Sequence, residues 1–448
     1  MANAQEEFEN SISIASLTKH FVDDIKDSRS TGVDMLTAEH VETNLSQNLH
    51  IINKKALSGD YKFTRYKLKL ISKGPKQYPR EISIPTVRDK IALKALNAFL
   101  QLRLKKHVNQ KLPQLVVKEF IKKLQSSDFD TVIRLDVKSY YPSIRHDELL
   151  SRLRRFIKYP EAIAMVESAL ATPTTTVSQK KISKNLCGVP QGLSISNVLA
   201  NLYLRNIDNW GGKLSNACYF RYVDDILMLC DKSDASDIKG SIIHKLNRAG
   251  LSAHKFEPGS KSTIENSTAS FDYLGYSFNA RKLPGVVSVR DSSIEKLKNS
   301  IIGLFTAYSK APNSNDGLLK WRMDLRITGC INEKKTKGWL FYFSELNDKQ
   351  LLFELDHFIE QMKARFKFTK DFRSFVKAWH EIKAKKWESH YFPNFDNFTD
   401  AKKLEVIMMI RPETKRKEFS TPEKLDRLFR RLISREVREL EIDILDFS

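Results

Sequence analysis

The chain has 448 residues, of which 41% are hydrophobic and 29% are charged. This length is enough for about three domains of roughly 150 residues each, and the composition is typical of a globular protein with a sizeable core. Lysine and arginine number 75 against 54 aspartate and glutamate, which gives a net charge of +21. Because polyphosphate backbones are the commonest large polyanions in a cell, this excess favours a nucleic-acid partner. The basic residues are spread along the chain and no apolar run approaches the ~20 residues that cross a bilayer, so no membrane partner is expected.

The cysteines give no sign of a metal or disulfide framework. All four are far apart and none forms a CxxC pair: Cys187, Cys218, Cys230 and Cys330. A zinc site is therefore not expected, and reduced thiols fit a cytoplasmic location. The first ten residues are acidic and polar, unlike a secretory signal peptide.

The first third of the chain predicts helices around one hairpin. Residues 1–59 are interpreted as helical, with Leu45, Leu49 and Ile52 on one face. Alternating apolar residues at 67–72 and 80–84 flank a Gly-Pro turn, which predicts a β-hairpin. Helical spacing resumes over residues 87–104.

The middle third mixes strands and helices, and the last third is mostly helical. Residues 131–135 form an apolar run that leads into Asp136, and residues 219–230 indicate a strand, a tight turn and a second strand. Helices are expected at residues 193–207 and 236–249, β-structure at 271–278, and further amphipathic helices at 351–366 and 425–445. The predicted fold class is α+β with a mostly α-helical C-terminal third.

Acidic residues interrupt two of the apolar strands. Asp136 ends the first, and Asp224 and Asp225 lie at the tip of the predicted hairpin. If the strands pair, the carboxylates repel one another by about 4 kcal/mol per pair at ~4 Å and an effective dielectric of about 20. Two divalent cations would relieve this repulsion; Mg²⁺ suits an all-oxygen site, with Mn²⁺ as an alternative. The other interpretation is that Asp-Asp is an ordinary hairpin turn.

Three motifs in this region resemble those of reverse transcriptases. The sequence YVDD at 222–225 resembles their YxDD box, RLDVKSYY at 134–141 their first carboxylate motif, and GVPQGLS at 188–194 their PQG segment. The resemblance covers residues 69–278 and implies a right-hand polymerase fold of fingers, palm and thumb. It also implies two metal ions, one held by Asp136 and Asp224 with Asp225, the other by Asp136, Asp225 and the carbonyl of Val137.

The same resemblance assigns residues that face the nucleotide. Tyr141 matches the residue that excludes a 2′-hydroxyl, and Gln191 and Tyr222 match residues near the incoming nucleotide. On the hairpin, Lys73 and Arg80 are expected to contact the triphosphate. Lys261 is the chosen proton donor to the leaving pyrophosphate, with Lys255 as the competing choice. The sequence FDYLGY at 271–276 resembles the primer-grip hairpin, although its aromatic residues would equally suit a core.

The predicted organisation has four segments: residues 1–62 N-terminal helices, 63–285 fingers and palm, 286–370 a helical thumb, and 371–448 a basic helical extension. The predicted function is an RNA-directed DNA polymerase that adds dNTPs to a 3′-hydroxyl. The expected partners are an RNA template or non-coding RNA, the DNA product and dNTPs, with a homo-oligomer or partner protein also open.

Within the family, the run SISN at 194–197 and the FDYLGY box resemble bacterial antiphage enzymes, including the abortive-infection group, which implies a role in defence. Two alternatives remain. One is a retron- or intron-derived enzyme that works with a dedicated structured RNA, and the other is a non-catalytic nucleic-acid-binding protein on a polymerase scaffold.

Overall fold

The computed structural model describes residues 4–72, 78–109, 111–179, 183–257, 259–279, 285–312, 315–385, 387–413, 419 and 421–444. The chain groups into two compact units. Unit 1 comprises residues 1–111 and 123–266, and unit 2 comprises residues 112–122 and 267–448. Helices and strands alternate in unit 1 and helices dominate the C-terminal third, so the predicted α+β class is confirmed.

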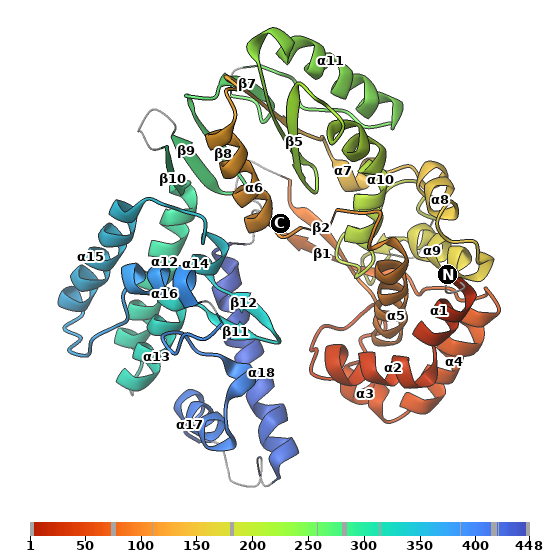
Figure 1. Ribbon diagram of the computed structural model, residues 1–448. Helices are drawn as coiled ribbons and strands as arrows, with labels where there is room; N and C mark the ends of the chain where they lie inside the picture. Colours follow the sequence, from red (N-terminus) through yellow and green to blue (C-terminus); the bar gives the residue numbers. More distant parts are fainter. Residues whose placement is uncertain are drawn as a thin grey trace. The chain divides into compact units, whose positions relative to one another are not determined.

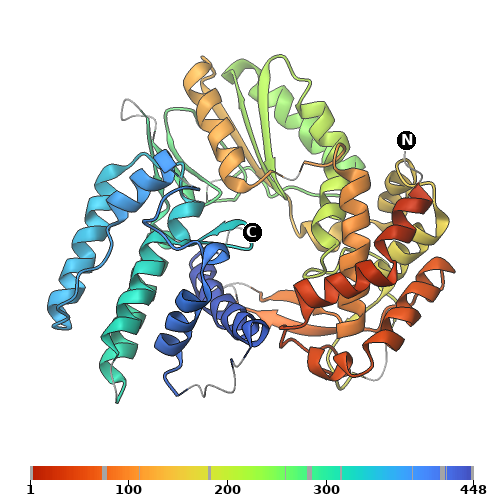
Figure 2. The same ribbon diagram turned by 60° about the horizontal axis from the view of Figure 1, so that its bottom comes forward.

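The N-terminal part of unit 1 is a helical layer around α5 (Val87–Leu104). Its other helices are α1 (Ala4–Ser11), α2 (Ile14–His20), a π-helical turn (Phe21–Ile25), α3 (Ala38–Glu42) and α4 (Leu45–Leu57). Apolar residues on several sides of α5 are buried, among them Ile91, Leu96 and Phe99. A helix that is apolar on several sides must be enclosed, and α1, α2 and α4 do pack against it (Figure 2).

The predicted hairpin is confirmed as β1 (Tyr66–Ile71) and β2 (Arg80–Ile84). β1 also pairs in parallel with the short β4 (Thr174–Thr175). The chain immediately before β4 forms three helices, α7 (Tyr140–Ser143), α8 (His146–Arg154) and α9 (Pro160–Ala171).

The central sheet of unit 1 has the order β5-β6-β3-β7. Its strands are β5 (Ala217–Tyr222), β6 (Asp225–Cys230), β3 (Thr131–Asp136) and β7 (Thr263–Asn266), each antiparallel to its neighbours. The helices α10 (Ser196–Gly211) and α11 (Lys232–Arg248) pack against it (Figure 1). β6 is buried along almost its whole length, because it has strands on both sides and helices against it.

Unit 2 begins with a β-meander and continues as helices. Most of α6 (Pro113–Ser126) belongs to this unit, because Phe120 packs edge-on against rings of the meander. The meander consists of β8 (Ser270–Tyr273), β9 (Tyr276–Asn279) and β10 (Val286–Val289). The helices that follow are α12 (Asp291–Lys310), α13 (Asp316–Thr328), α14 (Trp339–Tyr342), α15 (Lys349–Arg365), α16 (Phe375–Lys385), α17 (Asp400–Ile410) and α18 (Pro422–Ile442), with a 3-10 turn at Phe395–Asn397.

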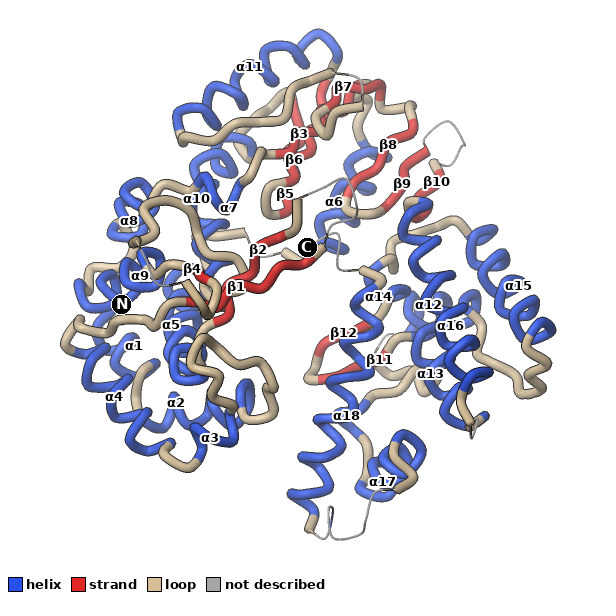
Figure 3. Tube along the Cα trace, turned by 180° about the vertical axis from the view of Figure 1, so that it is seen from behind, coloured by secondary structure: helices blue, strands red, loops and turns tan. Residues whose placement is uncertain are grey.

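A small hairpin, β11 (Cys330–Asn332) with β12 (Lys335–Lys337), lies among the helices of unit 2, as the tube drawing shows near α14 and α18 (Figure 3). The helix α18 begins at Pro422 after the cap Thr421, whose hydroxyl accepts from the Lys424 N–H. One face of α18 packs into the core through Leu428, Phe429 and other apolar side chains, as its helical spacing predicts. None of the described helices has both the length and the apolar character that a membrane crossing requires.

Candidate active site

Strand pairing in unit 1 brings the sequence-distant acids together. Asp136, the last residue of β3, is the direct partner of Asp225, the first residue of β6. Directly opposed residues of an antiparallel pair have Cα atoms about 4.5–5.5 Å apart and side chains on one face of the sheet. Asp224 immediately precedes β6, and its carbonyl accepts a 3.4 Å hydrogen bond from the Val137 N–H. Asp136 and Asp225 are far apart in sequence, and the register of β3 with β6 brings them together as the motifs predicted.

The turn that carries the acids has an unusual backbone. Tyr222 and Asp225 pair across it, and Val223 between them has a φ of 53°. This left-handed conformation is rare for a residue branched at Cβ, and such strain of roughly 1–3 kcal/mol persists only where the surroundings impose it. Two-residue hairpin turns usually have glycine, asparagine or aspartate at such a position, so a valine there is unusual.

The buried side chain of Arg221 stabilises this turn through hydrogen bonds. Its guanidinium donates to the Val223 carbonyl at 2.7 Å and to the Asn201 side-chain oxygen at 3.0 Å. It also donates to both carboxylate oxygens of Asp208 at 2.6 Å, a bidentate pair whose arginine is only 1% exposed. Burial alone would lower the pKa of Arg221, but the hydrogen bonds and charge of Asp208 raise it, so the arginine stays charged.

The carboxylates of the site repel one another. Burial raises the pKa of Asp224, and the nearby Asp136 carboxylate raises it further. Burial, followed by the charge of Asp224, raises the pKa of Asp225 to about 7. Such pKa shifts arise where carboxylates share a low-dielectric site. They indicate that the protein's own cations do not fully neutralise the negative charge there.

Two basic side chains partly supply that charge at Asp136. His254 Nε2 lies 3.1 Å and Lys261 Nζ lies 3.6 Å from the same carboxylate oxygen, Oδ2. The His254 N–H also donates to the Asp136 carbonyl at 3.0 Å, and the Ser262 hydroxyl accepts from the Asp136 N–H at 3.2 Å. Burial lowers the pKa of His254, although Asp136 opposes this shift. Both Lys261 and its competitor Lys255 are exposed, and it is the 3.6 Å distance to Asp136 that places Lys261 at the site.

The donor chemistry of the site fits divalent metal ions. Within the described ranges, no group of three or more histidine, cysteine, aspartate or glutamate side chains closes around one point as a metal site. One carboxylate oxygen of Asp136, Oδ2, contacts His254 and Lys261. Neighbouring carboxylates are the hard oxygen donors that such ions prefer, so Asp136, Asp224 and Asp225 would hold them, with the carbonyl of Val137 as a further donor.

Three of the residues expected to face the nucleotide lie near the acids. Burial, and then the charges of Asp224 and Tyr222, raise the pKa of Tyr141 to about 12, and the charge of Arg80 opposes this rise. Arg80 lowers the pKa of Asp224, so its cation lies within electrostatic reach of the carboxylates. Tyr141 and Tyr222 are half-buried, so part of each ring is accessible at this site.

The loop that contains Gln191 is fixed against the hairpin. The Gln191 carbonyl accepts from the Ser83 N–H of β2 at 2.7 Å. Gly192 has a φ of 99°, and a Cβ there would lie 2.7 Å from Ile82 Cγ2. Gly188 similarly has a φ of 88° and no room for a Cβ beside Pro142. Both positions therefore require glycine, because a larger residue would collide with neighbouring parts of the chain. The hydrogen bond to Ser83 places Gln191 against β2, the strand that begins at Arg80.

Other expectations have different outcomes. Lys73 lies outside the described residues. The rings of the 271–276 segment are core: Tyr273 and Tyr276 are fully buried, and Tyr276 donates from its hydroxyl to the Tyr342 carbonyl at 2.6 Å. Of the two readings left open for this hairpin, the structure favours packing of unit 2 over contact with a primer.

Sequence reasoning missed the supporting residues of the site. His254 and Ser262 reach Asp136 from a segment more than a hundred residues away in sequence. Arg221 adjoins the YVDD box, so its position was a usable signal, but its partner Asp208 lies on α10. Histidine and serine are common and carry no pattern here that marks them in advance.

Comparisons with known proteins agree with this geometry. Residues 71–278 match the family described as reverse transcriptase (RNA-dependent DNA polymerase). The retron Se72 reverse transcriptase of Salmonella heidelberg is 30% identical over 151 residues, which are 32% of this chain and 36% of that protein. A COX1/OXI3 intron 1 protein of Saccharomyces cerevisiae is 26% identical over 189 residues, 40% of this chain and 22% of that protein.

Among solved structures, an apo telomerase of Candida tropicalis, truncated from its C-terminal domain, is similar at 15% identity with a TM-score of 0.40, covering 51% of this chain and 55% of that one. The matched segments span less than two fifths of the length of the two curated relatives described above. Residues 71–278 are similar to a reverse transcriptase domain, and the three sequence motifs and the pairing of Asp136 with Asp225 fall within that segment.

Proposed function

We propose that the chain is an RNA-directed DNA polymerase that adds deoxynucleotides to a 3′-hydroxyl at Asp136, Asp224 and Asp225. The observation that supports this most directly is the pairing of Asp136 with Asp225 beside Asp224. In the reaction, the 3′-hydroxyl oxygen bonds to the α-phosphorus, the bond to the β-phosphate oxygen breaks, and pyrophosphate leaves. Two Mg²⁺ or Mn²⁺ ions held by the acids would activate the hydroxyl and neutralise charge on the triphosphate.

The remaining residues have separate roles in this proposal. Tyr141 limits the space beside the sugar and so favours a deoxynucleotide, and Tyr222 and Gln191 line the nucleotide position. Arg80 and Lys73 neutralise triphosphate charge. Lys261, whose ammonium lies 3.6 Å from Asp136, donates a proton to the leaving pyrophosphate. The four-segment division into N-terminal helices, fingers and palm, thumb and basic extension remains part of the proposal.

The test measures incorporation of labelled dNTP by the full chain on an RNA template with a DNA primer, and without added template, in Mg²⁺ or Mn²⁺. The double variant Asp224→Asn, Asp225→Asn is expected to lose roughly a thousandfold or more of the rate, because it removes several kcal/mol of transition-state stabilisation. Asp237→Asn, an exposed aspartate on α11, is the matched control. Undiminished incorporation by the double variant would refute the site.

The finer proposal is a cytoplasmic role in bacterial antiphage defence. It rests on the resemblance of residues 194–197 and 271–276 to that group. Cells that express the chain should lower phage plating, and the Asp224, Asp225 double variant should not. Equal protection by the unchanged chain and the double variant would show that defence does not require DNA synthesis.

The match to a retron reverse transcriptase supports one alternative, an enzyme that acts with a dedicated structured RNA. Sequencing the nucleic acid that copurifies with the chain distinguishes the two: one abundant structured RNA favours the alternative, and a varied population does not.

A further inference from the structure

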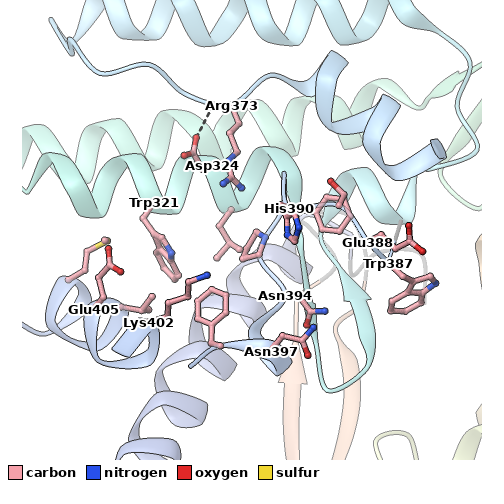
Figure 4. Close-up of a pocket in the computed structure, with 17 residues that line it drawn as sticks. Trp321, Asp324, Arg373, Trp387, Glu388, His390, Asn394, Asn397, Lys402 and Glu405 are labelled. Carbon is pink, nitrogen blue, oxygen red and sulfur yellow. Dashed lines mark hydrogen bonds between the residues drawn. The ribbon is translucent and has the colours of Figure 1, made fainter. Parts of the chain in front are cut away.

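Unit 2 contains a pocket that the proposed chemistry does not use. Its volume is about 540 Å³, within the range of small-ligand sites. It lies between α13, the segment 387–398 and α17, and all its lining residues belong to unit 2. Figure 4 shows side chains from these separate elements directed into one space, among them Trp321 from α13 and Lys402 from α17.

The floor of the pocket is aromatic and packs against the core of unit 2. Trp321 and Phe398 are half-buried and pack against a hydrophobic cluster that includes Phe395. The ring of Phe395 lies 6.4 Å from that of Trp321 and 5.2 Å from that of Phe398. Because the core holds both rings, a planar ligand that stacks on them would lose little of its binding energy to ordering the protein.

The rim adds two cations and hydrogen-bonding groups. Arg373 is anchored by its backbone N–H, which donates to Asp324 Oδ1 at 2.8 Å, and its guanidinium lies 5.3 Å from the ring centre of Tyr391. Lys402 Nζ lies 5.8 Å from the ring centre of Phe398, so a cation and an aromatic ring are presented together. The side-chain amides of Asn394 and Asn397, from the 387–398 segment, also line the pocket (Figure 4).

This combination selects a class of ligand. The lining also contains the carboxylates of Asp324, Glu388 and Glu405, which outnumber the two cations and so disfavour a polyphosphate. An apolar molecule would use neither the cations nor the amides of the rim. A flat heterocycle with hydrogen-bonding edges and a single phosphate suits both the floor and the rim. Unpaired bases in nucleic acids are recognised in this way, by stacking on aromatic rings and hydrogen bonds to their edges.

We propose that this pocket binds one nucleotide unit, its base against Trp321 and Phe398 and its phosphate toward Arg373 and Lys402. The unit is either an unpaired nucleotide of a single strand or a free nucleotide. This site is separate from the carboxylates of unit 1 and does not depend on the proposed polymerase function.

The test uses the full chain with Asp224→Asn and Asp225→Asn, so that no synthesis takes place. Fluorescence anisotropy measures binding of a labelled single-stranded RNA dodecamer and of an abasic strand of equal length. Trp321→Leu with Phe398→Leu should weaken binding of the RNA by roughly fivefold to a hundredfold, the range for loss of base stacking, and leave the abasic strand within about twofold. Trp321→Phe, which keeps a ring, should retain most of the binding.

The matched control is Phe353→Leu, which removes an exposed ring of α15 outside this pocket and should change neither affinity. Urea unfolding of each variant identifies any that fails to fold. Independently of the variants, a 4-thiouridine strand should crosslink to peptides that contain Trp321 or residues 387–409.

Competition by adenosine or cytidine monophosphate distinguishes the two sources. Displacement of the strand from the parent protein but not from the Trp321→Leu, Phe398→Leu variant indicates that free nucleotides enter the pocket. Lack of displacement, with the crosslink present, indicates a nucleotide within a strand. Unchanged RNA affinity in a folded Trp321→Leu, Phe398→Leu variant, or crosslinks confined to other segments, would overturn the proposal.

Discussion

The carboxylates at the candidate site of unit 1 and the buried carboxylates of unit 2 have opposite surroundings. In unit 2, Glu436 receives two hydrogen bonds from Arg322, at 2.6 and 3.0 Å, and Asp443 is paired with Arg326 and with the Ser300 hydroxyl. In unit 1, Asp224 and Asp225 neighbour each other and Asp136, and the like charges raise their pKa values beyond the effect of burial. A buried carboxylate matched to an arginine serves the fold, whereas a group of carboxylates beside one another indicates a site for positive charge from outside.

The backbone shows the same contrast. The turn of the YVDD box in unit 1 places the β-branched Val223 at a φ of 53° and relies on Arg221 beneath it. The β8–β9 turn of unit 2 also has positive φ, at Leu274 and Gly275, but there glycine provides one of the two positions and the flanking rings are simply core. Strain beside buried acids is therefore a better sign of function than a positive φ alone.

The largest expected effect tests the structural pair of unit 2. Arg326→Met should lower the free energy of unfolding by about 3–5 kcal/mol, because Asp443 is left buried without its cation. Burial already raises the pKa of Asp443, against the opposing charge of Arg326, so the folded state takes up a proton at a higher pH than the unfolded state. The destabilisation should therefore shrink as pH falls from 7 to about 5, as urea unfolding would measure. Arg326→Met with Asp443→Leu should recover much of the loss, and an equal loss in the double variant would contradict the pairing argument.

A second test concerns the support of the site in unit 1. Arg221→Lys keeps the charge but loses the bidentate geometry with Asp208 and the bond to Val223, so the turn should shift. The rate of incorporation is expected to fall by about a hundredfold, as for misplacement of reacting groups by about 1 Å. The concentration of Mg²⁺ required for half-maximal rate should rise, which a general loss of stability would not produce. Arg248→Lys on the exposed side of α11 is the control, and an unchanged Mg²⁺ requirement would argue against a positioning role.

A third test concerns the nucleotide side of unit 1. Tyr141→Ala opens the space beside Asp224 and should lower discrimination against ribonucleotides by roughly tenfold or more. Tyr141→Phe keeps the ring and should keep the discrimination. The ratio of kcat/KM for dNTP and rNTP measures both. An equal ratio in the Tyr141→Ala variant and the unchanged chain would mean that the sugar of the nucleotide does not lie beside Tyr141.

The smallest effect tests whether strain is stored in the turn. Val223→Asn replaces a β-branched residue by one that tolerates the left-handed region, so the free energy of unfolding should rise by about 1 kcal/mol. The exposed Val177→Asn is the control, since Val177 is absent from the residues with positive φ. A decrease in the stability of Val223→Asn would mean that packing of the valine outweighs its backbone strain.

The sequence alone determined the local structure and the principal acids. Periods of two and of 3.6 residues predicted the hairpin at 67–84, the helix at 87–104 and the long helix near 425–445, because side-chain periodicity is a local property. The motifs at 134–141, 188–194 and 222–225 were sufficient to predict which carboxylates would meet, and the register of β3 with β6 brings Asp136 opposite Asp225.

Only the tertiary structure decided which residues surround those acids and how the chain divides. His254 at Asp136, Asp208 under Arg221 and the pocket at Trp321 each join segments that are distant in sequence, and no local period encodes such contacts. Most of α6 groups with unit 2 although unit 1 flanks it in sequence, because Phe120 packs against rings that appear some 150 residues later. Burial, pKa shifts and backbone strain arise only when these segments meet, since they depend on the dielectric environment and packing of the folded chain.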